Sequence, residues 1–282
     1  KFTWKQGIFA DKSHDTEHVR TADFNKDGHL DVVFVAEDDQ NHEMYLGNGD
    51  GTFKDVSDRL LSKSESNGLD VGDVNGDGLP DIILGNTGSS AHNFLWLNDP
   101  KNPGHFIDAT STALPGPGSQ TQSIKLADLN GDKHLDMIEG NEVPPNRLFF
   151  NDGKGNFREQ ASKLELLVPL HTREVLVFDA NGDKKPDILF LNLTSNGGKF
   201  EKDPTAPLLI NDGKGNFKDV TEHAAPVLRN IGMITGASAS DVDGDSGADL
   251  VVVGDWVSIK LLINGGGVFR QSGQAALRPS RG

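Results

Sequence analysis

A short acidic segment that occurs five times holds most of the side chains in this chain that could do chemistry. The first copy spans residues 23–31 and reads DFNKDGHLD, with oxygen-bearing side chains at positions 1, 3, 5 and 9 and a glycine at position 6. Carboxylates this close repel one another by about 1 kcal/mol even in water. Ca²⁺ removes that repulsion, because it takes roughly six to eight oxygen ligands from carboxylates, amides and carbonyls. The residue types and their spacing therefore predict a calcium loop.

Four further copies begin at residues 73, 128, 179 and 241, at intervals of 50 to 62 residues. A repeat of this length indicates one supersecondary unit used several times. Each copy is followed by a short apolar run (VVFVA, IILGN, MIEGN, ILFLN or LVVVG), which is typical of a buried strand. An EF-hand would need a helix there and a glutamate at position 12, which only the third copy has, as Glu139. The sequence therefore favours a β-repeat over EF-hands.

Further strands complete each unit. The residues before each acidic segment alternate between apolar and polar, which predicts a strand, and the polar residues Arg20 and Asp70 are expected to pair across neighbouring units. After a variable loop come another apolar strand, a glycine-rich turn and a phenylalanine that opens a last strand. These phenylalanines are expected to fill the core: Phe53, Phe106, Phe157, Phe217 and Phe269.

Each unit thus has four strands, with the acidic loop between the first and the second. A four-stranded antiparallel unit repeated in this way is a β-propeller blade. We therefore expect one all-β domain over residues 1–282, a β-propeller with five blades. The expected blades are residues 16–60, 66–113, 120–163, 171–224 and 233–275, and residues 1–10, which resemble residues 269–277, are expected to form an extra outer strand. A chain cut from a larger propeller is the alternative.

The charge of the chain comes from the acidic loops. The net charge is −15, and the loops hold 16 of the 42 acidic residues, which leaves 26 acids against 27 Lys and Arg elsewhere. No surplus of basic residues remains to bind phosphate backbones, so we expect no nucleic-acid partner. No apolar run approaches the roughly 18 residues that span a bilayer, so no membrane insertion is expected. Cysteine is absent, which excludes disulfides and thiolate chemistry but not secretion.

The repeated pattern D-x-[DN]-x-D-x-x-x-D, followed by an apolar strand and by segments such as NDGKGNF and FKDV, resembles the FG-GAP/VCBS repeat of integrin α-chain heads and of many microbial extracellular propellers. The resemblance covers residues 16 to 275 approximately. It implies up to five Ca²⁺ ions and an extracellular, cell-surface or periplasmic location. The chain begins at Lys1 without a signal-like segment, which leaves open that an export signal has been removed.

The resemblance also implies which atoms hold each ion: the side chains of positions 1, 3, 5 and 9 and the backbone carbonyl of position 7. The implied ligands are Asp23, Asn25, Asp27, His29 and Asp31; Asp73, Asn75, Asp77, Leu79 and Asp81; Asp128, Asn130, Asp132, His134 and Asp136; Asp179, Asn181, Asp183, Lys185 and Asp187; and Asp241, Asp243, Asp245, Gly247 and Asp249. The imidazoles of His29 and His134 are expected to point elsewhere. Three loops carry Lys133, Lys184 or Ser246 instead of glycine at position 6. A side chain forced to positive φ costs about 1 kcal/mol, so these loops are expected to bind calcium more weakly than the first two.

Variable loops lie at the end of the blades away from the acidic loops, and recognition usually belongs to such loops. The candidate ligand-binding residues there are Trp256, His171, Arg173, Glu37 and Asp38. No nucleophile elbow, phosphate loop or zinc-hydrolase motif is present, so no catalytic residue is assigned and a non-enzymatic protein is favoured. The leading hypothesis is a calcium-stabilised extracellular propeller that binds a glycan or a protein. The alternatives are a polysaccharide lyase or hydrolase on the same fold, and a structural module of a larger surface protein.

Overall fold

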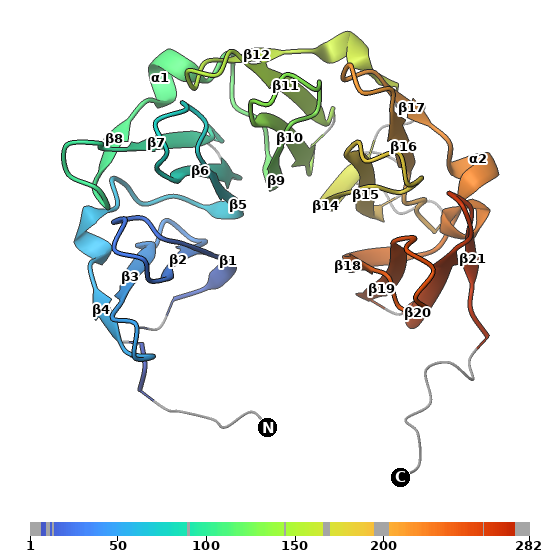
Figure 1. The fold of residues 1–282 in the computed structure, drawn as a ribbon, viewed down its shortest axis with the longest axis horizontal. Helices are drawn as coiled ribbons and strands as arrows, with labels where there is room; N and C mark the ends of the chain where they lie inside the picture. The colour runs from blue at the N-terminus through green and yellow to red at the C-terminus, as the bar shows by residue number, and fades with distance from the viewer. Residues whose placement is uncertain are drawn as a thin grey trace. The chain divides into compact units, whose positions relative to one another are not determined.

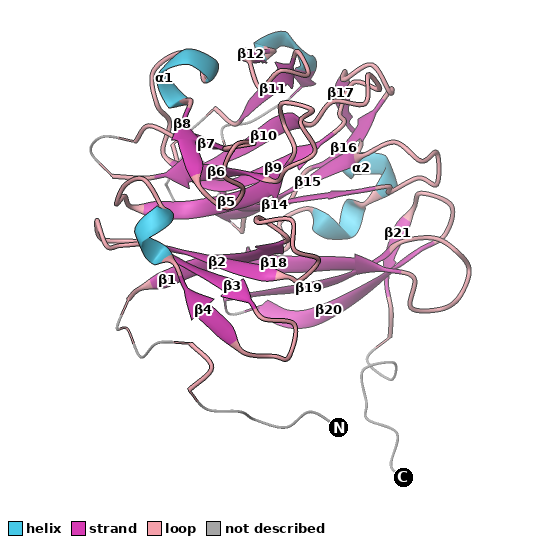
Figure 2. Ribbon diagram, turned by 60° about the vertical axis from the view of Figure 1, so that its left-hand side comes forward, coloured by secondary structure: helices cyan, strands magenta, loops and turns pink. Residues whose placement is uncertain are grey.

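The computed structural model describes residues 7–9, 12, 14–88, 91–143, 145–165, 170–194, 203–255 and 257–273, and these residues form an all-β structure (Figure 2). Five sheets each contain four antiparallel strands, in the order expected for a propeller blade (Figure 1). The chain divides into two compact units, Lys1–Leu126 with Asn151–Arg158, and Ala127–Phe150 with Glu159–Gly282. No helix among the described residues is long and apolar enough to cross a bilayer.

The strand boundaries follow the repeat. The first sheet contains β1 (Thr16–Ala22), β2 (Asp31–Ala36), β3 (Glu43–Gly47) and β4 (Phe53–Asp55). The second contains β5 (Ser66–Gly72), β6 (Asp81–Asn86), β7 (Phe94–Asn98) and β8 (Phe106–Asp108). The third contains β9 (Thr121–Ala127), β10 (Asp136–Asn141), β11 (Arg147–Asn151) and β12 (Phe157–Glu159). The fourth contains β14 (His171–Phe178), β15 (Asp187–Thr194), β16 (Leu208–Asn211) and β17 (Phe217–Asp219). The fifth contains β18 (Met233–Ser240), β19 (Asp249–Asp255), β20 (Val257–Asn264) and β21 (Phe269–Gln271).

A few elements lie outside the predicted pattern. A two-stranded parallel pairing joins β13 (Leu164–Glu165) to β17 at the edge of the fourth sheet. One-turn helices follow the last strands of several sheets: η1 (Ser57–Arg59), α1 (Thr110–Ala113), η2 (Ala161–Lys163), α2 (Thr221–Ala224) and η3 (Pro226–Leu228). The carboxylate of Asp219 starts α2 by accepting hydrogen bonds from the backbone N–H and the hydroxyl of Thr221, at 2.9 and 2.6 Å.

The predicted core phenylalanines are confirmed. Each one opens the last strand of its sheet, and four of the five are no more than 8 % exposed, while Phe53 is half-buried. In the first unit, apolar residues of the first and second sheets form one core, which includes Val33, Ile82 and Trp96. In the second unit, Leu189, Leu250 and Phe269 belong to a core made by the fourth and fifth sheets. Each sheet therefore buries its apolar faces against a neighbouring sheet of the same kind, as propeller blades do.

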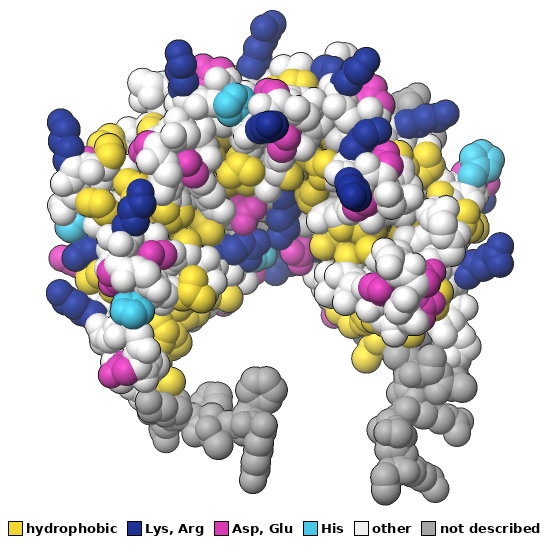
Figure 3. Space-filling model, in the orientation of Figure 1, with side chains coloured by type: hydrophobic (Ala, Val, Ile, Leu, Met, Phe, Trp, Pro, Cys, Tyr) yellow, Lys and Arg dark blue, Asp and Glu magenta, His cyan; other side chains and the backbone are white. Residues whose placement is uncertain are grey.

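The predicted ion pair between first strands is also present. Nε of Arg20 on β1 donates to Oδ1 of Asp70 on β5 at 2.9 Å, and Oδ2 of Asp70 accepts the backbone N–H of Leu126 at 2.8 Å. The aspartate thus connects three consecutive first strands, β1, β5 and β9. Elsewhere, acidic and basic side chains are interspersed on the face shown in Figure 3, in keeping with the balanced charge outside the acidic loops.

The predicted outer strand at residues 1–10 lies mostly outside the described residues, and residues 7–9 are not in a strand. Phe9 nevertheless packs on the first sheet. Its ring centroid lies 5.2 Å from that of Phe34, 4.9 Å from that of Tyr45 and 5.0 Å from that of Phe53. The N-terminal segment therefore covers part of an aromatic face of this sheet.

Candidate metal sites

The same hydrogen-bond pattern shapes all five acidic loops. The backbone N–H of position 6 donates to Oδ2 of the position-1 aspartate at 2.8 to 3.1 Å, and the N–H of position 7 donates to Oδ1 of the position-5 aspartate at 2.7 to 3.0 Å. The N–H of position 5 donates to the side-chain oxygen of position 3 at 2.9 to 3.2 Å. These bonds turn the chain tightly and bring the side chains of positions 1, 3 and 5 together. The spacing of the sequence thus produces convergent oxygens through local backbone bonds.

Position 6 has a left-handed backbone in every loop, as predicted. The φ angle is +87° at Gly28 and +82° at Gly78, and it remains positive at Lys133 (+73°), Lys184 (+66°) and Ser246 (+75°). Glycine adopts this conformation without strain, whereas lysine and serine do not. At position 6 the last three loops therefore carry backbone strain that the first two avoid. The first loop is strained at position 4 instead, where Lys26 has φ at +63° and the other four loops have glycine.

Position 9 is a buried aspartate in every loop, no more than 1 % exposed. Its Oδ2 accepts the N–H of position 2 at 2.8 to 3.0 Å, which ties both ends of the loop together. Its Oδ1 accepts an N–H from the third strand in four of the sheets, from Gly47, Asn98, Asn211 and Asn264. A carboxylate has about four lone-pair sites, so these bonds leave room for a cation ligand on each oxygen.

Burial makes these aspartates difficult to ionise in the absence of a cation. The pKa of Asp81 is raised to about 7, chiefly by burial and also by the charges of Asp77 and Asp73, against hydrogen bonds from Asn98 and Val74 that lower it. For the same reason the pKa of Asp187 is raised to about 6, and that of Asp31 is also raised. A divalent cation would favour the ionised form of these carboxylates, and the oxygen-only donor set fits Ca²⁺.

The fifth loop has the most carboxylates. Asp243 takes the place of the asparagine found at position 3 of the other loops, and carboxylate oxygens of Asp241, Asp243 and Asp249 all lie within 4.8 Å of one another. A cluster of this size matches the distances between oxygens around one hard cation.

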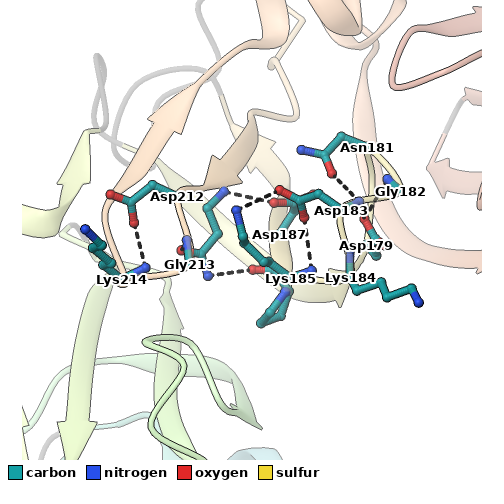
Figure 4. A network of polar contacts seen from close by, with 12 residues as sticks. Asp179, Asn181, Gly182, Asp183, Lys184, Lys185, Asp187, Asp212, Gly213 and Lys214 are labelled. Atoms are coloured by element: carbon teal, nitrogen blue, oxygen red, sulfur yellow. Dashed lines mark hydrogen bonds and ion pairs between the residues drawn. The ribbon is translucent and has the colours of Figure 1, made fainter.

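The fourth loop differs from the others by an internal ion pair, shown in Figure 4. Nζ of Lys185, at position 7, lies 3.1 Å from Oδ2 of Asp183. The pKa of Asp183 is lowered: burial acts to raise it, but the N–H and the ammonium of Lys185 outweigh that effect. In the first loop, by contrast, the imidazole of His29 lies against the glycine-rich turn. A Cβ built on Gly49 would lie only 2.4 Å from Cε1 of this imidazole.

Asparagines at the ends of third strands connect consecutive sheets, a role that the sequence analysis did not predict. Nδ2 of Asn98 donates to the carbonyl of Phe24, at position 2 of the first loop, at 2.8 Å. Equivalent bonds run from Asn151 to Val74, from Asn211 to Leu129 and from Asn264 to Ala180, at 2.7 to 2.9 Å. The first sheet has Gly47 at this place, where a Cβ would lie 2.3 Å from the carbonyl oxygen of Leu30. The repeated asparagine before each glycine-rich turn was the signal available in the sequence.

The opposite end of the sheets has a buried polar connection of its own. The N–H of Ala36 donates to Nδ1 of His42 at 3.1 Å, and Nε2 of His42 lies 3.0 Å from Oγ of Ser64. Asparagines take the place of His42 in the next two sheets, where Asn86 N–H donates to Asn93 at 2.9 Å and Asn141 N–H donates to Asn146 at 2.8 Å. The pKa of His42 is lowered to about 4, chiefly by burial and also by the charge of His14. His42 is therefore neutral at physiological pH and serves as an acceptor.

The candidate recognition residues fall into separate segments of the chain. Asn67 Nδ2 donates to Oε1 of Glu37, and Asp38 is exposed with φ at +54°. His171 is half-buried at the start of β14, and burial lowers its pKa, as does Arg173. Arg173 falls where the register between β14 and β15 shifts, at a bulge. Trp256 lies outside the described residues.

Comparison with known proteins agrees with this architecture. A family model described as "FG-GAP-like repeat" matches residues 23–84 and 73–139. The chain therefore contains FG-GAP-like repeats, carried on propeller-type blades, and the resemblance predicted from the sequence is confirmed.

Particular relatives extend the comparison. Cartilage acidic protein 1 of Xenopus tropicalis is 29 % identical over 198 residues, which cover 66 % of this chain and 28 % of that protein. The human protein of the same name is 27 % identical over 199 residues, 66 % of this chain and 27 % of its own length. This chain thus spans less than a third of these relatives. The crystal structure of the exotype rhamnogalacturonan lyase YesX matches 91 % of this chain and 48 % of its own, with 13 % identity and a TM-score of 0.50, which shows a shared fold.

Proposed function

We propose that this chain is a calcium-stabilised extracellular recognition module. The observation that carries the proposal is the position-9 aspartate, which is buried in all five loops and hydrogen-bonded in the same way each time. A buried carboxylate that faces two further acidic side chains is stable only if it is protonated or paired with a cation. Five repetitions of one oxygen-only arrangement favour the cation.

Calcium would supply positive charge at the point where each blade's first and second strands are joined. The side chains of positions 1, 3, 5 and 9 would hold it, together with the carbonyl of position 7. Five ions would reduce the formal charge from −15 to −5. Because Asn98 and its equivalents bond to position 2 of the preceding loop, an ordered loop also supports the next sheet along the chain.

An extracellular location is part of the proposal. The curated relatives are named for cartilage. Free calcium outside cells is near the millimolar affinities typical of extracellular calcium modules, so such loops would be filled there. Absence of cysteine fits this setting if metal ions supply the cross-links that disulfides provide in other secreted domains.

Recognition is assigned to the variable loops at the end of the blades opposite the metal loops. The loop that carries Glu37 and Asp38, the start of β14 with His171 and Arg173, and the segment around Trp256 differ between blades in length and chemistry. A rigid scaffold with variable loops is the usual arrangement of a binding protein. The ligand class proposed is a glycan or an extracellular protein.

Two measurements test the proposal. Isothermal titration with Ca²⁺ on metal-free protein should show several binding events with dissociation constants of roughly 0.1 to 1 mM. A glycan array and a polysaccharide-degradation screen, each run with Ca²⁺ and with EGTA, then test recognition. Binding without turnover supports the proposal. Depolymerisation of a polysaccharide would establish the lyase or hydrolase alternative, and a titration without any binding heat, confirmed by native mass spectrometry, would refute the calcium sites.

A further inference from the structure

In the fourth acidic loop, a lysine ammonium lies beside the position-5 aspartate. Oδ2 of the position-5 aspartate accepts an asparagine amide in the first two loops, at 2.8 Å from Asn25 to Asp27 and 3.0 Å from Asn75 to Asp77. In the fourth loop the same oxygen, on Asp183, meets the ammonium of Lys185 at 3.1 Å. Asn181 also hydrogen-bonds to Asp183, so the fourth loop adds a full positive charge to the amide contact that the first two loops have.

The glycine-rich turn holds the stem of this lysine against the loop. A Cβ built on Gly213, which has φ at +81°, would lie 2.7 Å from Cδ and 2.8 Å from Cε of Lys185. The stem therefore runs directly over the backbone of Gly213, in space that only a glycine leaves open. His29 packs on Gly49 in the same way in the first loop. In both loops, therefore, the side chain of position 7 packs on a glycine of the glycine-rich turn.

The neighbouring lysine does not share this role. Lys184 follows the same backbone turn, but its side chain extends away from the loop carboxylates in Figure 4, whereas Lys185 reaches toward Asp183. The two lysines are adjacent, have equal charge and differ in whether they pair with the loop. They provide a matched comparison within one loop.

This inference rests on the calcium sites proposed above. We propose that the ammonium of Lys185 takes the place of a metal cation in the fourth loop when no metal is bound. This ammonium neutralises Asp183, so this loop keeps its conformation without Ca²⁺ and binds Ca²⁺ most weakly of the five. The conformation of the acidic loop in the fourth blade then depends less on bound Ca²⁺ than that of the other four loops.

The size of the effect follows from the charges. Before Asp183 can bind Ca²⁺, the ammonium must leave its oxygen, and loss of a partly exposed ion pair costs up to about fivefold in affinity. The displaced ammonium remains tethered within a few ångströms of a divalent ion, which costs a further few-fold at the dielectric of a protein surface. Together these terms weaken calcium binding at the fourth loop by about tenfold.

The test compares the full chain with K185Q, which keeps the stem and removes the charge, and with K184Q as the control. Calcium itself is the probe, in isothermal titration and native mass spectrometry. Hydrogen exchange of the peptide that contains residues 179–187 is measured in EGTA and in Ca²⁺. We expect K185Q to tighten one event about tenfold and K184Q to change it less than threefold. In EGTA, exchange of this peptide should be up to about fivefold faster in K185Q than in the wild type and in K184Q.

Each outcome bears on one claim. Equal effects of K185Q and K184Q, or an unchanged affinity in both, would overturn the role of Lys185. A wild-type chain that binds no Ca²⁺ would refute the proposed function instead. The exchange measurement in EGTA would still decide the role of Lys185 in that case, because equal protection in the wild type and K185Q would contradict it.

Discussion

Replacement of Asn98 by alanine should cost this chain about 3 kcal/mol of stability. The side chain is fully buried at the end of β7, and it makes three hydrogen bonds. Nδ2 donates to the carbonyls of Phe24 at 2.8 Å and Pro80 at 3.1 Å, and Oδ1 accepts the N–H of Gly104 at 2.9 Å. Each bond contributes about 1 kcal/mol net, and alanine leaves all three partners buried without a replacement.

The assay is thermal unfolding at saturating Ca²⁺, with Asn102→Ala as the control. Asn102 is an exposed residue of the neighbouring turn, so its side chain should contribute less than about 0.5 kcal/mol. For a chain of this size, about 3 kcal/mol corresponds to a fall in Tm of roughly 5 to 10 °C. Asn98→Asp separates the two functions of the side chain, because it keeps the acceptor for Gly104 and loses both donors; it should lose most of the same stability at neutral pH.

If Asn98→Ala lowered Tm no more than Asn102→Ala, the connection between consecutive sheets would contribute no net stability. The proposal that each acidic loop supports the next sheet along the chain would then be wrong. A large loss of stability in Asn98→Ala with unchanged stability in Asn98→Asp would also contradict the proposal. That result would assign the whole loss to the hydrogen bond with Gly104 in the turn.

Three further predictions follow from the metal loops, the buried histidine and the variable loops. Removal of calcium by EGTA should lower Tm by many degrees, because about 1.4 kcal/mol per site at tenfold excess amounts to roughly 7 kcal/mol over five sites; an unchanged melting curve would argue against structural calcium. His42 has a folded pKa of about 4, below its unfolded value of about 6.5, so the stability it contributes is present above pH 6.5 and about 3 kcal/mol is lost as pH falls to 4. His42→Asn, which copies Asn93 of the second sheet, should remove that part of the pH dependence, measured by denaturant unfolding from pH 7 to 4; identical slopes in both proteins would contradict it. Trp256→Ala should weaken binding of a glycan found by the array about five- to 150-fold without lowering Tm, whereas Asp132→Ala should lower Tm with little effect on affinity; the reverse pattern would place recognition at the metal loops.

Local patterns in the sequence were enough to predict the sheets and the acidic loops. Strand identity depends on alternation and on β-branched runs within a few residues. Loop shape depends on bonds from backbone N–H groups to side-chain oxygens that are at most seven residues away. The positive φ at Lys133 and Lys184 could be predicted for the same reason, because it follows from the position of each residue in a nine-residue turn. The one-turn helices were missed, since four residues carry no periodicity.

Relations between distant residues required the tertiary structure. The partner of Asn98 is a backbone carbonyl 74 residues earlier in the chain, which no spacing rule indicates. The equivalence of His42 and Asn93 became visible only when both were found to accept a hydrogen bond from the end of a second strand.

The fourth loop shows the division most clearly. The sequence by itself determined that this segment is a tight acidic turn with a strained lysine at position 6, because those properties are local. Which lysine pairs with the loop carboxylate was decided by the fold: the stem of Lys185 packs on Gly213 of the glycine-rich turn and its ammonium lies beside Asp183, while Lys184 points away. Side-chain direction at an exposed turn depends on what packs beside it, and here that neighbour comes from a different part of the chain.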